Sequence, residues 1–238
     1  MVKQSKWPMI GAEWNPLARG ESDRLAGWLQ EASPRRAARC FQTIAVGVGL
    51  YGATIGIWHG PRMAAYVALK LPLVVFLTLL VNGFVNGLLA QILGSGLGFR
   101  QTGGALLMAF AVFALITGSL SPLTWFLSWN VPGPDSPEAG AIHRRLLVIH
   151  TVLIAFAGIV SVRKLHGIVT AFSGSRAAAR RTLIAWLAGN LFAGAQIGFL
   201  LRPIFGTPKV GVAFLRPDAF EGNFYESLWW ALRHFFTH

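Results

Sequence analysis

The sequence predicts an all-α fold, a polytopic transmembrane helix bundle of about five spans with amphipathic interfacial helices at both termini. Hydrophobic residues make up 54% of the chain and charged residues only 13%, whereas soluble domains carry about 25% charged residues. Five long stretches hold no Asp, Glu, Lys or Arg, and each can contain a membrane-spanning helix of roughly 17–25 residues. They are continuously apolar, unlike the alternating strands of a membrane β-barrel. The stretches are 40–61, 71–99, 101–134, 146–162 and 182–201.

The chain divides into three parts. Residues 1–39 are polar and form a cytoplasmic arm, residues 40–201 form the five-span bundle, and residues 202–238 form an extracytoplasmic tail. In the arm, Ser22 can cap a short helix that Pro34 ends. We expect this helix to lie on an anionic inner leaflet, beside the arginines that follow it. The alternative is a partner-binding or disordered arm.

The charge-free stretches also set the expected spans of the bundle. The segment 63–72 is either an interfacial segment or an extension of the second span. The expected spans lie near 41–58, 71–93, 104–128, 146–162 and 182–201.

The loops orient the bundle through the positive-inside rule. The loop 163–181 holds five bases and no acid, whereas the loop 130–140 holds two acids and no base. We therefore expect a multi-pass protein of a bacterial inner membrane with a cytoplasmic N-terminus and a periplasmic C-terminus. These loops explain the net charge of +12 without nucleic acid. The expected partners are the lipid bilayer and other membrane subunits or a second copy of the chain.

Three pairs of glycines predict close helix packing, because small residues let helix backbones approach each other in a bilayer. The contacts lie within one monomer or, alternatively, between copies. The GxxxG pairs are Gly52 with Gly56, Gly83 with Gly87, and Gly194 with Gly198.

Four amide side chains lie within the expected spans, where an unpaired amide is costly. We expect them to form interhelical hydrogen bonds; the alternative is a small polar binding site. They are Asn82, Asn86, Asn190 and Gln196.

The chemistry of most membrane enzymes and pumps is missing from the sequence. All nine Asp and Glu lie outside the expected spans, whereas an ionisable group usually marks an ion-coupled pathway. No P-loop, G-x-S-x-G or H-E-x-x-H motif occurs. We expect a protein that is not an enzyme and that has neither a metal nor a catalytic residue.

Histidines allow one cofactor hypothesis, although no cofactor is expected. His59 ends the first span and His150 lies in the fourth, both on the outer side. The pair can ligate a haem or a chlorophyll-type pigment. The simpler interpretation makes His59 an interfacial residue and His150 a hydrogen-bonded packing residue.

The tail ends in a predicted amphipathic helix. Arg202-Pro203 ends the fifth span, and apolar residues recur at helical spacing from Asn223 onward. Asn223 and Glu226 suit the start of this helix. Its aromatic face favours the headgroup layer or a neighbouring subunit. The tail residues expected to form this interface are Phe224, Tyr225, Trp229 and Trp230.

Two stretches of the sequence carry motifs of known membrane proteins. One is LKLPLVVFLTLLVNGFVNGLL followed by FRQTGGALLMAFAVFALITGSLSP, with a lysine-proline pair and an FRQ-like turn. It resembles the five-span proteins of the Yip (Rab-GTPase-interacting) superfamily and its bacterial relatives. The other is the tail GAQIGFLLRPIFGTP…FLRPDAFEGNFYESLW, which resembles the end of uncharacterised bacterial multi-span proteins. The resemblance implies a five-helix bundle with a cytoplasmic N-terminus and brings no catalytic residue. The matching positions are Lys70, Pro72, Phe99, Arg100, Gln101, Arg202, Pro203, Phe205, Gly206, Pro208, Phe224 and Tyr225.

The absent carboxylates, the glycine faces and the aromatic termini favour a non-catalytic scaffold, assembly factor or accessory subunit of a larger membrane complex. A tetrapyrrole-binding electron-transfer or light-harvesting subunit is the second hypothesis. A small-solute transporter or channel lined by the four amides is the third.

Overall fold

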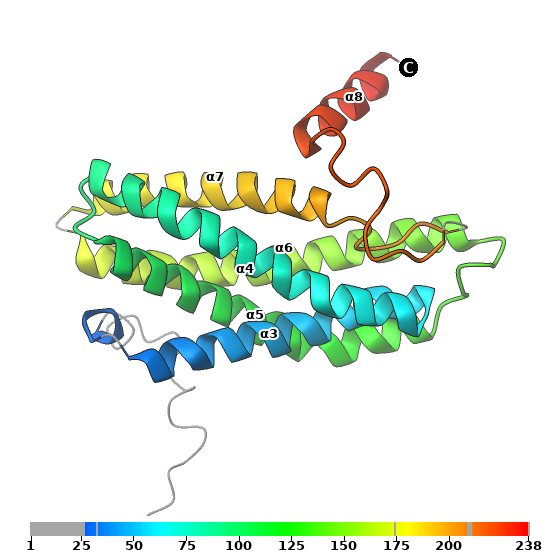
Figure 1. The fold of residues 1–238 in the computed structure, drawn as a ribbon, viewed down its shortest axis with the longest axis horizontal. Helices are drawn as coiled ribbons and strands as arrows, with labels where there is room; N and C mark the ends of the chain where they lie inside the picture. The colour runs from blue at the N-terminus through cyan, green and yellow to red at the C-terminus, as the bar shows by residue number, and fades with distance from the viewer. Residues whose placement is uncertain (1–26, 32, 174, 209–210, 238) are drawn as a thin grey trace, which may run out of the picture.

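The computed structural model describes residues 27–31, 33–173, 175–208 and 211–237, and these contain helices and no strand. Five long helices lie side by side, and a shorter one stands away from them (Figure 1). Each of the five is long and apolar enough to cross a membrane, which confirms the predicted all-α bundle of five spans. They are α3 (Pro34–Gly56), α4 (Pro61–Ile92), α5 (Phe99–Trp129), α6 (Ala139–Phe172) and α7 (Arg176–Leu200); η1 (Ile57–His59) and α8 (Phe224–Thr237) complete the fold.

Local signals explain where three of the helices begin. The Ser33 hydroxyl accepts a hydrogen bond from the backbone of Arg36 at the start of α3, where Pro34 is the first residue. Gln101 Oε1 accepts one from the Gly98 amide at the start of α5, and Ser175 caps α7. Such contacts satisfy amides that have no partner inside the helix.

Each bundle helix is longer than the span expected from the sequence. The helix α3 begins at Pro34, inside the segment 1–39 that was assigned to the arm. Charged side chains at a helix end extend their heads to the membrane surface, so a helix continues beyond the charge-free stretch. The arm helix predicted between Ser22 and Pro34 begins outside the described residues, but its later part is described, and residues 27–30 are helical.

The segment 63–72 belongs to the second span. Since α4 begins at Pro61 and continues to Ile92, the segment forms one continuous helix with the second span, as one of the two alternatives predicted. Lys70 and Pro72 consequently lie about two to three turns inside the helix instead of at its start. This places a lysine within a membrane-spanning segment.

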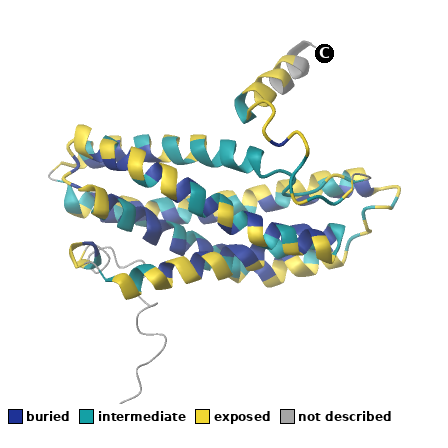
Figure 2. Cartoon of the chain, viewed as in Figure 1, coloured by how far each residue is buried: buried dark blue, intermediate teal, exposed yellow. Residues whose placement is uncertain are grey.

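Glycine lets α3 approach both of its neighbours. A Cβ added at Gly52 would lie 2.6 Å from the Val67 carbonyl oxygen of α4. Gly47, on another face of α3, packs directly against the Ala114 backbone of α5. Buried residues accordingly concentrate where the helices face one another (Figure 2). Of the five long helices, α7 is the least buried by the rest of the protein: only 6% of its most apolar 18-residue segment is buried.

The helix connections alternate between two ends of the bundle. The arm end holds the start of α3 and the connections 93–98 and 173–175. The tail end holds η1, the connection 130–138 and the segment 201–223 that leads to α8. The candidate site begins at the tail end.

Candidate functional site

A loop of the tail folds back onto the bundle at the tail end. We call residues 202–208 and 211–217 the tail loop. Its Ile204, Phe205 and Val212 side chains pack into a cluster with the buried Tyr51, Ile55, Met63 and Val67 of α3 and α4. The tail loop therefore covers this end of the bundle (Figure 1).

Lys70 of α4 contacts the side of the tail loop that faces the bundle. Its side chain is completely buried, and its Nζ donates a hydrogen bond of 2.8 Å to the Pro203 carbonyl oxygen. The same ammonium lies 5.0 Å from the centroid of the Phe214 ring, at a distance suited to a cation–π contact. No carboxylate of the described residues pairs with it. A buried cation is thus stabilised by one carbonyl and one ring.

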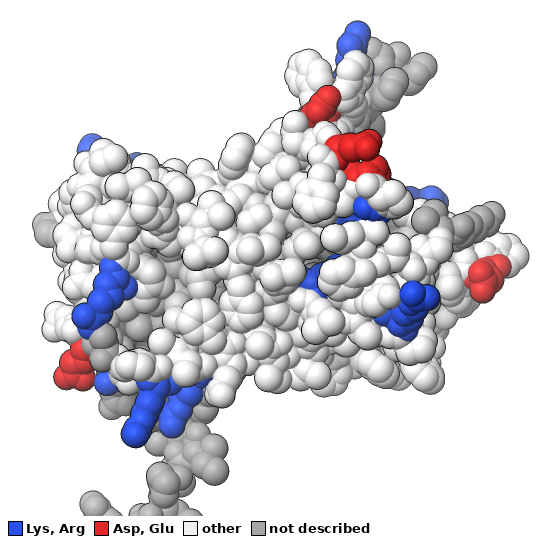
Figure 3. Space-filling view, in the orientation of Figure 1, with Lys and Arg blue, Asp and Glu red and all other residues white. Residues whose placement is uncertain are grey.

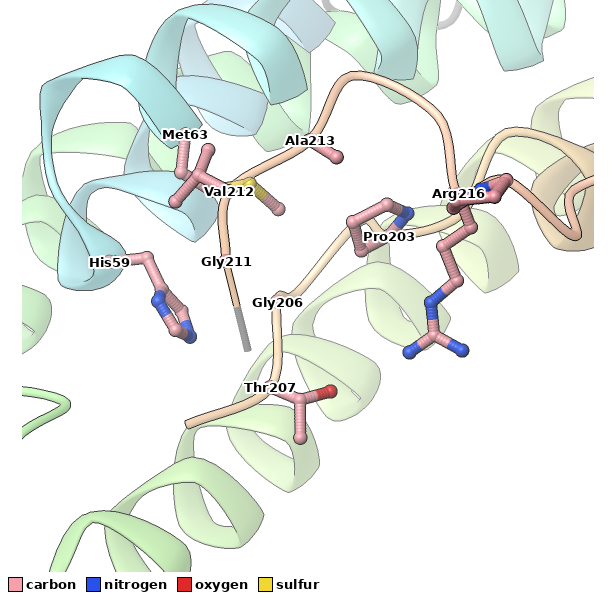
Figure 4. A pocket seen from close by; sticks show the side chains of 10 residues that line it. His59, Met63, Pro203, Gly206, Thr207, Gly211, Val212, Ala213 and Arg216 are labelled. Carbon is pink, nitrogen blue, oxygen red and sulfur yellow. The ribbon is translucent and has the colours of Figure 1, made fainter. Parts of the chain in front are cut away.

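His59 borders a cavity of about 130 Å³ under the tail loop. Figure 4 shows its ring directed toward Gly206 and Thr207, with Pro203 and Arg216 farther along the same cavity. The Nε2 atom is buried without a hydrogen-bond partner. Gly206 has a φ of 66°, and a Cβ there would lie 2.6 Å from the His59 ring. The loop can therefore pass this close only with glycine.

His150 lies in the packed interior behind the tail loop. Its Nδ1 lies 3.0 Å from the Tyr51 hydroxyl in a buried hydrogen bond, and its ring packs 5.8 Å from that of Phe205. His150 does not line the cavity that His59 borders. That cavity is also smaller than the roughly 300–1,000 Å³ of typical ligand pockets. The tetrapyrrole hypothesis draws no support from this geometry and stays a prediction.

The helix α4 carries a line of buried polar residues that winds partly around its axis. Lys70, Thr78, Asn82 and Asn86 are separated by multiples of four residues, which places them along one ridge of the helix. Each is at most 4% exposed. From Lys70 to Asn86 the helix rises about 24 Å, most of a hydrocarbon core of about 30 Å. We call these four residues the polar stripe.

Three members of the polar stripe, Thr78, Asn82 and Asn86, face α7. Asn86 Nδ2 donates to Asn190 Oδ1 over 3.5 Å, a long contact, and the Trp186 indole donates to the Asn86 carbonyl at 2.9 Å. A Cβ at Gly189 would lie 3.2 Å from the side-chain oxygens of Asn82 and Asn86. The glycine thus brings the α7 backbone against the stripe.

Several polar atoms along this contact have no partner. They are Thr78 Oγ1, Asn82 Nδ2 and Asn86 Oδ1 of the stripe, and Thr182 Oγ1 of α7. An unsatisfied buried group costs about 1–3 kcal/mol, and each one in a native structure needs an explanation such as bound water, an ion or a ligand. The contact between α4 and α7 therefore contains polar groups that helix packing alone does not explain.

Gln196 and α8 form a separate contact. Gln196 Oε1 accepts a hydrogen bond of 3.0 Å from the Phe224 amide, so Gln196 does not extend the polar stripe. The Tyr225 hydroxyl donates to the Phe192 carbonyl at 2.6 Å, and the two rings stack. Beyond these residues α8 leaves the bundle, with Trp229 66% and Trp230 50% exposed (Figures 1 and 2).

The six predicted packing glycines have different surroundings. A Cβ at Gly56 would lie 2.5 Å from the Met63 carbonyl oxygen, and Gly87 packs against the Phe99 ring. Gly194 and Gly198 have only ordinary contacts, and nothing lies within 4 Å of a Cβ at Gly83. Spacing alone therefore does not distinguish glycines in helix contacts from those facing outward.

Sequence reasoning did not single out Lys70, which the structure buries beneath the tail loop. It is the only charged residue between Arg62 and Arg100, which was the available signal. Two further contacts could not be predicted from neighbouring residues in the sequence. They are the hydrogen bond between Tyr51 and His150 and the one from Trp186 to the Asn86 backbone carbonyl.

The described residues hold no group of three or more His, Cys, Asp or Glu that could bind a metal. No family model, curated protein or solved structure matches the chain.

Proposed function

We propose that this membrane protein binds a small anionic solute beneath the tail loop and passes it along the polar stripe. The observation that carries the proposal is Lys70, a completely buried lysine without a carboxylate partner. An ionisable group inside a membrane-spanning helix marks a functional site by default.

An anion is the ligand that this lysine lacks. Moving an ammonium out of water costs several kcal/mol unless good partners replace the water. Lys70 has three donor hydrogens and one hydrogen bond, to the Pro203 carbonyl. A carboxylate, phosphate or halide would accept the others. His59 and Arg216 line the adjacent cavity, and the buried Nε2 of His59 has no hydrogen-bond partner.

The polar stripe supplies the rest of the proposed path. Unpartnered hydroxyl and amide groups at Thr78, Asn82 and Asn86 can replace the hydration of a moving solute. Because Gly189 packs against the stripe, passage requires α7 to move. The low burial of α7 makes it a helix that can move with little loss of buried surface.

Flux into liposomes tests this function. The purified chain is reconstituted, and uptake of chloride, acetate, phosphate and sulfate is compared with empty liposomes. We expect saturable uptake of at least one anion and a loss of about ten-fold or more in Lys70→Gln, which keeps a donor but removes the charge. Asn86→Leu should also abolish it.

The matched control is Arg62→Gln, which removes a cation from the exposed tail end of the same helix. It should leave uptake within about two-fold of the parent protein. Uptake no faster than in empty liposomes for all four anions, or equal uptake in Lys70→Gln, would exclude the proposed path.

The second candidate is the accessory or assembly subunit expected from the sequence, and α8 favours it. Hydrogen bonds from Phe224 and Tyr225 fix one end of α8 on α7, while Trp229 and Trp230 remain exposed. Tryptophan is enriched among residues that dominate protein interfaces. We propose an apolar surface of a second membrane subunit as its partner, at the periplasmic face of a bacterial inner membrane.

Gentle purification from the native membrane tests this second candidate. A stoichiometric partner chain should co-elute with the parent protein and be lost in Trp229→Ala/Trp230→Ala. Elution without a partner, or retention of that partner by the double variant, would count against the subunit role of α8.

A further inference from the structure

At the arm end, a hollow of about 310 Å³ opens between residues 28–29, residues 33–40 and the first turns of α5. We infer that it binds the headgroup and upper chain of one anionic phospholipid. It is distant in the fold from the tail loop, so the inference stands independently of the proposed solute path.

The floor of the hollow is apolar and preformed. Leu29, Cys40, Leu107 and Met108 line it, and each is less than a tenth exposed. Gly104 belongs to the same lining, and a Cβ there would lie 2.8 Å from a methyl group of Leu29. Such a surface at the end of a membrane bundle suits the upper part of an acyl chain.

Two guanidinium groups border the floor. Arg100 is exposed at the first turn of α5, and no described residue pairs with its guanidinium. Arg36 forms an ion pair of 3.2 Å with Glu31 and lies 5.3 Å over the Trp28 ring. Arginine binds phosphate with two parallel hydrogen bonds. The helix N-terminus beside Arg100 also favours an anion.

The surrounding charge favours an anionic lipid over a zwitterionic one. Figure 3 shows basic side chains grouped at the arm end. Among the described residues, Glu31 is the only Asp or Glu at the arm end of the bundle. The bases there are Arg35, Arg36, Arg39, Arg100, Arg163, Lys164, Arg176, Arg180 and Arg181.

The apolar floor and the two bordering arginines together favour a phospholipid as the ligand. Free phosphate would use only the arginines and leave the apolar floor without a ligand. An uncharged lipid would use only the floor. An anionic phospholipid matches both, with its phosphate at Arg100 and its chain on Leu107 and Met108.

Native mass spectrometry of the full chain in mild detergent tests the inference. We expect one phosphatidylglycerol to bind in preference to phosphatidylcholine. Arg100→Gln should weaken this binding about five-fold, which is the usual contribution of one basic side chain near anionic lipid. Leu107→Trp should also weaken it, because the indole fills the floor without changing charge.

Arg180→Gln is the matched control, since it removes one exposed arginine from the same end outside the hollow. It should keep the affinity within about two-fold. Equal binding of the two lipids, or equal losses in Arg180→Gln and Arg100→Gln, would overturn the inference. Competition by inorganic phosphate alone, at millimolar concentrations and equally in Leu107→Trp, would identify a simple phosphate site and overturn it too.

Cys40 provides a second readout, because it is the chain's one cysteine and lies in the floor of the hollow. Phosphatidylglycerol should slow its alkylation by a small maleimide several-fold in the parent protein and in Arg180→Gln. The rate in Arg100→Gln should change little. Lipid-independent alkylation in the parent protein would contradict occupation of the hollow.

Discussion

Lys70 Nζ and the Pro203 carbonyl oxygen, 133 residues apart in the chain, lie 2.8 Å from each other at the tail end of the bundle. This hydrogen bond joins the second membrane-spanning helix to the loop that follows the fifth. It also places the ammonium beside the Phe214 ring of the same loop. One side chain thus supplies both the charge beneath this end and a polar contact that helps to close it.

Lys70→Leu should loosen the tail loop, because it removes both the hydrogen bond and the cation–π contact. A hydrogen bond from a charged group contributes about 1.5–3 kcal/mol. Hydrogen exchange should therefore accelerate by ten-fold or more in the amides of residues 204–207 and 211–216. Lys70→Gln should give a smaller increase. Unchanged exchange in Lys70→Leu would show that apolar packing of Ile204 and Phe205 holds the loop by itself.

Asn82→Leu should stabilise the bundle while impairing flux. The Asn82 amide nitrogen is buried without a partner, and relief of such a group is worth about 1 kcal/mol or more. Thermal unfolding in detergent should shift upward relative to the parent protein. Polar groups kept at the expense of stability are typical of functional sites. A marked destabilisation would instead indicate that Asn82 has a structural partner, such as a buried water.

Gly52→Ala should destabilise the bundle, because its Cβ would lie 2.6 Å from the Val67 carbonyl oxygen of α4. Overpacking of this kind costs about 1–3 kcal/mol. Gly83→Ala is the control on another helix, where nothing lies within 4 Å of the added Cβ. Its unfolding midpoint should be equal to or above that of the parent protein. Similar losses in both variants would reject the assignment of Gly52 to the α3–α4 contact.

Acid should release the tail loop through Asp218. The Arg202 guanidinium donates a hydrogen bond of 3.1 Å to this carboxylate and holds its pKa below the usual value. A lowered folded-state pKa means that the pair stabilises the loop at pH values above the unfolded pKa of about 3.9. That contribution is lost as the pH falls through the lower folded-state value.

Hydrogen exchange of residues 211–223, corrected for its intrinsic pH dependence, measures this effect. The protection should fall at acid pH in the parent protein, and Asp218→Asn should show a smaller change. Because Asp218 is exposed, high salt should weaken the pair. Identical acid profiles for the parent protein and Asp218→Asn would exclude this carboxyl as the group that titrates.

The fold was largely predictable because a membrane imposes local requirements. A span must be long and apolar, so uncharged stretches located all five helices, although charged ends such as Arg35 and Arg36 concealed the first turns of α3. The tail helix was equally readable: Asn223 Oδ1 accepts from the Glu226 amide at 2.8 Å and begins α8 as predicted. Cap residues and helical spacing act over only a few positions.

The sequence by itself determined an all-helical chain with five candidate spans and an aromatic C-terminal helix, since length and apolar composition are properties of single segments. Only the tertiary structure decided which polar groups meet. It joined Tyr51 to His150, aligned the polar stripe with Gly189 and brought Pro203 over Lys70. Such pairs depend on helix rotation and loop path, and in a bilayer small differences in packing determine both.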